Sequence, residues 1–334
     1  MKSGIITVEP DQIYPVKALR LKYKGISYFA GPVPPDWAGI PNPNEEEMDE
    51  QLGTIRNDLG CNAIIITGGE DYEDKLIECG RLAIEKGFER IHIQPRYMGV
   101  SPSETVERIG KFAARVRELR QMSEAVIYSL GHEFGLETAI VRGDSWSERV
   151  KNFLRQDPRD LENIRVTLRR MFKDILAFCR QNYGYKVSYA AISYTETEIV
   201  PWEDPAFESV GVDAILEEGL GCTETWVFDL LSSLKKYRKP IQSMEAGCMT
   251  FTGAGRIAGT APLHTQETLL YDEDEQATWM KRYCDLLNRA RIDGYFYTQY
   301  NDPRGWDKGY GLYNPDTRKR KKGFYLYKSY QRSP

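Results

Sequence analysis

Eight short apolar segments alternate with longer segments of helical spacing along most of this chain. The apolar segments are predicted strands at residues 25–30, 61–67, 90–95, 123–133, 187–193, 212–216, 240–245 and 294–300. No glycine-rich nucleotide-binding motif accompanies them. Eight strand-then-helix units therefore predict an α/β fold, a single closed (β/α)8 TIM barrel, and not an open doubly wound sheet.

Local signals place several of the helices. Ser101 followed by Pro102 predicts a capped helix start, and the stretch 144–182 predicts a helix interrupted near Pro158. Further helices are expected at 224–237, 273–290 and 324–330. At 334 residues the chain fits one barrel domain, 1–334. We expect an irregular N-terminal segment at about 1–22 and a Gly-rich loop at about 248–272, after the seventh strand.

The composition of the chain limits the kinds of partner that it can bind and the places where it can work. The formal net charge of −4 argues against a nucleic acid or an anionic membrane surface. No segment has the length and apolar character of a membrane span, and the N-terminus lacks a secretory apolar region, so we expect a cytoplasmic protein. The six cysteines lack ligand spacing and are expected to be buried free thiols. With only three histidines we expect no metal and no cofactor. A homo-oligomer stays open.

Two of the predicted strands end in a glutamate, Glu133 after Ala125-Val-Ile-Tyr and Glu245 after Ile241-Gln-Ser-Met. A carboxylate at the end of a buried strand is costly unless it is paired or used in chemistry. The carboxyl ends of barrel strands all open onto one face. Two facing carboxylates there suit glycoside hydrolysis, in which one protonates the leaving oxygen and the other attacks or activates water. The alternative is two solvent-facing loop carboxylates, because the chain has 49 acidic residues.

Further candidate substrate-binding residues lie near the predicted strand ends. Arg96 could hold a substrate carboxylate, keep Glu245 ionised, or form a structural ion pair. The loop 253–262, with Arg256 and the nearby His264, is expected to shape the pocket. Trp306 would suit stacking against a sugar ring. The complete candidate set is Tyr28, Gln94, Arg96, His132, Tyr194, Trp202, Glu217, Glu218, Gln299, Asn301, Asp302 and Trp306.

Three segments carry a resemblance to known enzymes. Gly131-His-Glu133, Glu245-Ala-Gly-Cys and the stretch 291–298 resemble the acid/base, nucleophile and eighth strands of the clan A glycoside hydrolases. Within that clan, Val210-Gly-Val-Asp213 and the run from Glu245 to Ala254 most resemble a prokaryotic group labelled "abortive infection protein", a label that states no chemistry. The resemblance implies a retaining mechanism, with Glu133 as acid/base and Glu245 as nucleophile.

Two positions depart from the clan pattern. His132 stands where many members have an asparagine that holds the sugar 2-hydroxyl. The tyrosine usual at the end of the sixth strand is missing, and carboxylates from Asp213 to Glu218 are available there instead. If Glu217 or Glu218 lay close to Glu245, like-charge repulsion would raise a pKa in the site. A substrate with a cationic or metal-bridged group is then conceivable.

The sequence thus predicts a retaining glycoside hydrolase or transglycosylase whose partner is a carbohydrate substrate. The alternatives are a non-catalytic carbohydrate-binding barrel, such as a phage-defence sensor, and a metal-dependent barrel lyase or hydrolase. The metal-dependent alternative would use Glu217, Glu218, Glu245 and His132, because oxygen-rich clusters suit Mg²⁺ or Mn²⁺. The sugar, the linkage, and exo or endo action stay open.

Overall fold

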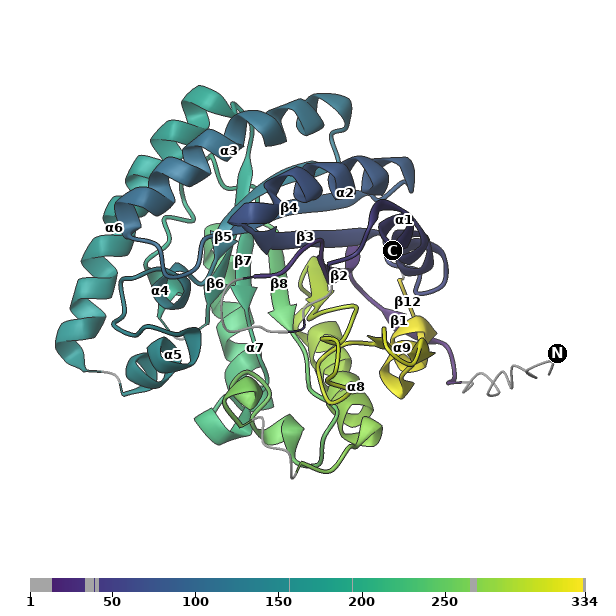
Figure 1. Ribbon diagram of the computed structural model, residues 1–334. Helices are drawn as coiled ribbons and strands as arrows, with labels where there is room; N and C mark the ends of the chain where they lie inside the picture. Colours follow the sequence, from purple (N-terminus) through teal and green to yellow (C-terminus); the bar gives the residue numbers. More distant parts are fainter. Residues whose placement is uncertain are drawn as a thin grey trace.

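The computed structural model describes residues 14–33, 39, 42–155, 157–193, 195–264 and 269–332. Eight parallel strands close into a barrel in chain order from β2 to β9. Figure 1 shows labelled barrel strands at the centre, with helices around them. This confirms the predicted (β/α)8 architecture. The barrel strands are β2 Tyr23–Phe29, β3 Ala63–Gly69, β4 Arg90–Arg96, β5 Val126–His132, β6 Val187–Ile192, β7 Val210–Asp213, β8 Ile241–Ala246 and β9 Gly294–Tyr297.

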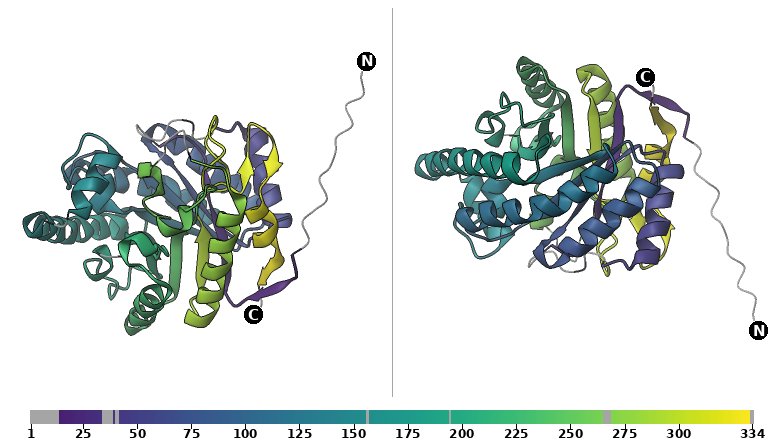
Figure 2. Two further views of the ribbon diagram at one scale, coloured as in Figure 1. Left: turned by 90° about the horizontal axis from the view of Figure 1, so that it is seen from below. Right: turned by 90° about the horizontal axis from the view of Figure 1, so that it is seen from above.

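Helices surround the barrel, as the two views of Figure 2 show. Ser101 caps α3 by accepting a hydrogen bond from the Glu104 N–H, with Pro102 at the first helical position, as predicted. The break near Pro158 is also confirmed, because α6 begins there. The helices are α1 Glu45–Asn57, α2 Glu73–Glu85, α3 Pro102–Met122, α4 Phe134–Glu137, α5 Trp146–Leu154, α6 Pro158–Asn182, α7 Glu224–Ser233, α8 Glu273–Ala290 and α9 Lys322–Ser329, with 3-10 turns η1 Glu70–Tyr72, η2 Glu196–Glu198, η3 Glu218–Leu220, η4 Leu234–Tyr237, η5 Ala254–Arg256 and η6 Ala261–His264.

Two small sheets lie outside the barrel. Strand β1, Lys17–Leu19, pairs in parallel with β12, Tyr330–Arg332, so the two ends of the described chain lie side by side. Strand β1 falls inside the segment expected to be irregular, of which residues 1–13 lie outside the described part. Strands β10, Tyr313–Asn314, and β11, Lys319–Arg320, form an antiparallel pair. The last helix ends at Ser329 because Tyr330 enters β12.

The core has two compartments. A large apolar cluster fills the space between the strands and the surrounding helices. A smaller cluster on five strands, which includes Ile65, Met244 and Phe296, fills the inside of the barrel. All six cysteines are buried free thiols, as expected. Among the residues described, no helix is long and apolar enough to cross a membrane.

A test of this packing uses Gly211 in β7. A Cβ atom at this position would overlap the carbonyl oxygen of Tyr189 in β6 and approach Cγ of Met244 at 2.9 Å. Since backbone cannot move aside cheaply in a closed barrel, Gly211→Ala should lower the free energy of unfolding by about 1–3 kcal/mol. Urea denaturation measures this change. Gly53→Ala in α1 is the control, because nothing lies within 4 Å of its Cβ. The control should raise stability by about 0.5–1 kcal/mol, and equal effects of the two changes would contradict the packing argument.

Candidate active site

Charged side chains from four strand ends meet in one pocket at the carboxyl-terminal face of the barrel. Arg96 ends β4, His132 ends β5, Asp213 ends β7, and Glu245 is the penultimate residue of β8. Glu133 follows His132 directly and lines the same pocket. The parallel strands therefore bring together residues that are more than 140 positions apart in the chain.

The backbone turns sharply at the end of β5. Glu133 has φ 37° and ψ 55°, the left-handed conformation that residues other than glycine seldom adopt. Gly131, two residues before Glu133, has φ 151°, and a Cβ atom on Gly131 would overlap the ring of Phe134. The Glu133 N–H donates to the Ala190 carbonyl at 2.9 Å, which ties the turn to β6. This strained turn lets both His132 and Glu133 face the pocket.

His132 lies between carboxylates on both sides of its ring. Its Nε2 lies 2.6 Å from Oε2 of Glu245 and 3.4 Å from Oδ2 of Asp213. Its Nδ1 lies 2.9 Å from Oε1 of Glu137. Burial and the Arg96 charge lower the pKa of His132, but Glu245, Asp213 and Glu133 outweigh them and raise it well above its ordinary value. His132 is therefore an imidazolium near neutral pH.

Arg96 supplies the second buried cation. Its Nε donates to Oε1 of Glu137 at 2.6 Å, and its Nη1 lies 3.8 Å from Oε2 of Glu245. Both Arg96 and Glu137 are almost fully buried, with side-chain exposures of 1 % and 2 %. Arg96 thus forms a buried ion pair with Glu137 and adds positive charge beside Glu245.

The two glutamates at the strand ends sit in opposite electrostatic environments. Burial raises the pKa of Glu133; the His132 charge lowers it but is outweighed, because Glu245 and Glu196 raise it further, to about 7. Burial would also raise the pKa of Glu245, yet His132 and Arg96 outweigh it and hold that pKa at about 2. At neutral pH, Glu133 therefore carries a proton much of the time and Glu245 is ionised.

A second layer supports the turn at Glu133. Glu196, buried after β6, accepts hydrogen bonds from the Gly135 N–H at 2.5 Å, the Tyr189 hydroxyl at 2.7 Å and the Ile192 N–H at 3.1 Å. The Tyr189 hydroxyl in turn accepts from the Phe134 N–H at 2.7 Å. Glu196 and Tyr189 thus hold the start of α4, and with it Glu133.

Several predicted site residues are in place. Arg96, His132, Glu133 and Glu245 line the pocket. Gln94 lies within the barrel near the pocket floor, where its amide donates to Ser129 Oγ at 3.1 Å and to the Gly131 carbonyl at 3.2 Å. Gln94 therefore supports the Gly131 turn.

Other predicted residues lie outside the pocket, and these expectations need correction. Trp202 is fully buried against Phe207, and its indole donates to the Thr197 carbonyl at 2.9 Å, so its ring faces cannot stack on a sugar. Asp302 is buried in an ion pair with Lys321 at 2.5 Å. Tyr28 and Asn301 both bind the side chain of Gln51.

The remaining candidates also have partners or positions of their own. The Gln299 amide donates to the Asn301 carbonyl, and the half-buried Trp306 packs under Lys308, whose Nζ lies 5.4 Å from the ring centroid. Glu217 accepts hydrogen bonds from the Gly259 and Thr260 N–H groups. Tyr194 and the side chain of His264 lie outside the described part of the chain.

Glu218 pairs with Arg282 at 2.7 Å on the surface, outside the pocket. The donor set predicted for a metal-dependent enzyme, which needed Glu217 and Glu218 beside Glu245, is therefore not assembled. His132, Glu133 and Asp213 could instead each offer one atom within 4.8 Å of one another. In this second set, however, the Nε2 atom of His132, which lies 3.4 Å from Asp213, already lies 2.6 Å from an oxygen of Glu245.

Glu137 and Tyr310 were not among the predicted site residues, and Asp213 was named only among the carboxylates available at the end of the sixth strand. Asp213 carried a signal, a carboxylate next to an apolar strand. The predicted sixth strand at 212–216 hid that signal, because the observed β7 ends at Asp213. Glu137 and Tyr310 follow strand ends by several residues, so only the folded loops bring them close.

The pocket is tightly covered. Its volume is about 60 Å³, whereas ligand pockets usually measure about 300 Å³ or more. Trp146, Gly259, Pro262 and Tyr310 line it together with the charged residues. The Tyr310 hydroxyl donates to the Ala258 carbonyl and so links the β9–β10 connection to the loop after β8. A sugar ring therefore needs these covering residues to move aside.

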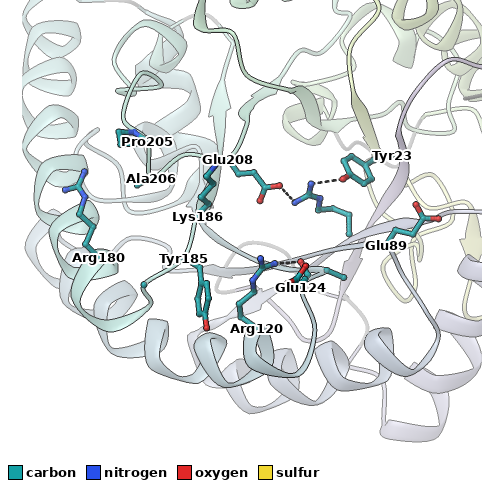
Figure 3. A pocket seen from close by; sticks show the side chains of 13 residues that line it. Tyr23, Glu89, Arg120, Glu124, Arg180, Tyr185, Lys186, Pro205, Ala206 and Glu208 are labelled. Carbon is teal, nitrogen blue, oxygen red and sulfur yellow. Dashed lines mark hydrogen bonds and ion pairs between the residues drawn. The ribbon is translucent and has the colours of Figure 1, made fainter.

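A larger hollow, of about 860 Å³, lies at the opposite end of the barrel. Figure 3 shows that charged side chains in it point toward one another. Arg90 donates to Glu208 at 2.5 Å and to the Tyr23 hydroxyl at 2.7 Å, and Arg120 donates to the Glu124 carbonyl. This end of a TIM barrel contributes to stability and not to catalysis, so the smaller pocket is the candidate active site.

Comparisons with known proteins find glycoside hydrolases. The model of Glycoside Hydrolase Family 113 matches residues 165–329, a range that contains Glu245. A family 113 β-1,4-mannanase structure superposes with a TM-score of 0.61 at 14% identity, over 93% of this chain and 98% of that one. A family 5 xyloglucan-specific endo-β-1,4-glucanase from a metagenomic library gives 0.59 at 12% identity, over 92% and 96%. The family 53 catalytic domain of Ignisphaera aggregans gives 0.57 at 13% identity, over 96% and 100%. No curated protein matches the chain.

The closed barrel, the charged pocket at its carboxyl-terminal face and the family match define a glycosidase. More particularly, the chain is a clan A glycoside hydrolase, and the enzymes of this clan retain the configuration of the anomeric carbon.

The buried ion pair of Arg96 and Glu137 can be tested by stability. Arg96→Met leaves the Glu137 carboxylate buried without its main cation, so the free energy of unfolding should fall by about 3–5 kcal/mol. Adding Glu137→Met should restore most of that loss, because the pair is then replaced by apolar groups. Arg320→Met is the control, since its pair with Asp58 is partly exposed and should contribute about 0–1 kcal/mol. A double variant no more stable than the single one would contradict the pairing.

Proposed function

We propose that the protein cleaves a β-glycosidic bond by double displacement, with Glu133 as acid/base and Glu245 as nucleophile. The observation that carries this assignment is the opposite pKa shift of the two carboxylates, to about 7 for Glu133 and about 2 for Glu245. A group that is protonated near neutral pH can donate a proton, and one that stays ionised can attack. The β linkage is part of this proposal, and the mannanase and glucanase with the same fold support it.

The two steps use the same two side chains. First, an oxygen of Glu245 bonds to the anomeric carbon, the bond from that carbon to the leaving oxygen breaks, and Glu133 gives its proton to the leaving oxygen. Next, Glu133 takes a proton from a water whose oxygen bonds to the carbon, and the ester bond to Glu245 breaks. An acceptor sugar in place of the water would give transglycosylation by the same chemistry.

His132 and Arg96 prepare the nucleophile in this scheme. The His132 Nε2 at 2.6 Å and the Arg96 Nη1 at 3.8 Å both face one oxygen of Glu245. These cations keep Glu245 ionised in a buried site, and they also fix its orientation. The tight cover over the pocket excludes water until the substrate moves it aside.

Some expectations remain proposals. We infer a cytoplasmic location and a carbohydrate partner, and we retain the resemblance to the group labelled "abortive infection protein". The charge of −4 is consistent with the absence of a nucleic-acid partner. A homo-oligomer stays open.

The first prediction from this mechanism concerns pH. Because only protonated Glu133 can act as acid in the first step, kcat/KM should be full below pH 7 and halved near pH 7, the pKa of Glu133. Above that point it should fall about tenfold per pH unit. Glu133→Gln should lower kcat/KM and remove this alkaline limb, with dinitrophenyl glycosides least affected because their leaving group needs no proton. Glu196→Gln is the comparison, since the pKa of Glu196 is also about 7; it should keep the alkaline limb but move it to lower pH, because the Glu196 charge raises the pKa of Glu133. An alkaline limb that follows Glu196 and not Glu133 would contradict the assignment.

The second prediction concerns the nucleophile. Glu245→Gln should reduce kcat at least about 1,000-fold on aryl β-glycosides, because no covalent intermediate can form. Proton NMR of the first product formed by the parent enzyme should show the β anomer. Glu218→Gln is the matched control and should keep parental activity, since Glu218 pairs with Arg282 away from the pocket. An α anomer as first product, or full activity of Glu245→Gln, would refute the proposed function.

A further inference from the structure

Asp213 is the one pocket carboxylate, among the described residues, whose two oxygens are both fully buried and both lack a hydrogen bond. Its side chain is 1 % exposed and lies at the end of β7, where it lines the same pocket as Glu133 and Glu245. The closest charged atom that the structure gives for it is Nε2 of His132, at 3.4 Å, and that nitrogen is nearer to Glu245. A buried carboxylate without a donor is costly. A ligand that brings a donor to Asp213 would remove this cost.

The charge balance of the pocket identifies the kind of donor. When Glu133 holds its proton, the carboxylates of Glu137, Asp213 and Glu245 face the cations Arg96 and His132. With Asp213 ionised as well, these carboxylates exceed the cations by one charge. Without a ligand, burial raises the pKa of Asp213 well above its ordinary value, the nearby His132 charge opposes this, and Glu133 and Glu245 reinforce it. A ligand carrying one positive charge would complete the balance.

Neighbouring carboxylates do not change this count. Glu196 accepts three hydrogen bonds from Gly135, Ile192 and Tyr189 and does not line the pocket. Glu217 is bound by the N–H groups of Gly259 and Thr260 and the hydroxyl of Thr260. No Lys and no second Arg is among the described residues that line the pocket. The missing cation is therefore not supplied by the described lining of the site.

The position of Asp213 relative to the nucleophile indicates where the positive group lies. An oxygen of Glu245 must reach the anomeric carbon, and His132 Nε2 touches that carboxylate at 2.6 Å and Asp213 at 3.4 Å. Asp213 is thus separated from the nucleophile by one ring nitrogen. The substituent on the carbon next to the anomeric centre is the part of a sugar that falls at this short range.

We propose that Asp213 binds a protonated amino group on that neighbouring carbon, so that the substrate is a 2-amino-2-deoxy glycoside with a free amine. This inference rests on the proposed function, since it locates the amine from the nucleophile Glu245. The bond formed is a charge-assisted hydrogen bond from the ammonium to the Asp213 carboxylate. An N-acetylated sugar lacks this charge and is disfavoured.

The test compares nitrophenyl β-glycosides that differ only at carbon 2, in the gluco, manno and galacto series. Each series contains the 2-amino, 2-hydroxy and 2-acetamido forms, assayed at about pH 6, where an amine is protonated. We expect kcat/KM for the best 2-amino substrate to exceed that of its 2-hydroxy counterpart by about 10- to 100-fold. In Asp213→Asn this ratio should fall to about one, since the carboxamide carries no charge. Asp204→Asn, at the Arg180 pair outside the pocket, should keep the ratio of the parent.

A binding measurement covers the case in which Asp213→Asn does not fold. Calorimetry with the parent protein should show tighter binding of the methyl 2-amino glycoside than of the methyl 2-hydroxy glycoside. Equal binding, a ratio of one in the parent, or a ratio unchanged in Asp213→Asn would overturn the inference. So would an equal loss of kcat on both substrates in Asp213→Asn, because Asp213 would then act on the charge at the anomeric carbon. If the protein cleaves 2-hydroxy substrates and shows no preference for an amine, this inference fails and the proposed function stands. If it cleaves no substrate but still binds the 2-amino glycoside more tightly, only the proposed function is refuted.

Discussion

The carboxylates of Glu137 and Glu245 share two buried cations, Arg96 and His132, at the mouth of the barrel. Arg96 forms an ion pair with Glu137 and lies near Glu245, and His132 has one carboxylate against each of its ring nitrogens. Ions this deep in a protein are costly to desolvate, so neither the cations nor the carboxylates are stable there alone. The position of each strand end in the site is therefore linked to the others by charge.

This sharing of charge also separates the roles of two chemically identical side chains. Glu245 receives both cations and stays ionised, whereas Glu133 lies 4.0 Å from the nearest ring nitrogen of His132 and beside other carboxylates. The difference in pKa comes from position around the barrel, because β5 and β8 are three strands apart. The charge on His132, at a position where many clan members have a neutral amide, thus strengthens the pKa difference on which the proposed roles of Glu133 and Glu245 rest.

The fold could be predicted from the sequence to a large extent, because its signals are local. Ser101 with Pro102 and Pro158 mark helix starts through caps and fixed dihedral angles, and apolar runs mark the strands. The site was predictable only where a residue follows such a run directly, as Glu133 and Glu245 do. Whether a residue beyond a strand faces the pocket depends on strand ends and on distant partners. Asp302 meets Lys321 from a later segment. Strand β7 ends at Asp213, before the end predicted for the sixth strand, and that later predicted end shifted attention from Asp213 to Glu217.

The left-handed backbone of Glu133 has a consequence for how such a site persists. A glycine or asparagine would occupy φ 37° with less strain than glutamate does. A buried carboxylate there adds a cost of desolvation to the cost of strain. Selection for stability alone would therefore favour replacement of this residue, and only a benefit that outweighs both costs keeps a glutamate there. The conformation of one residue thus separates a barrel maintained for turnover from one maintained only as a scaffold.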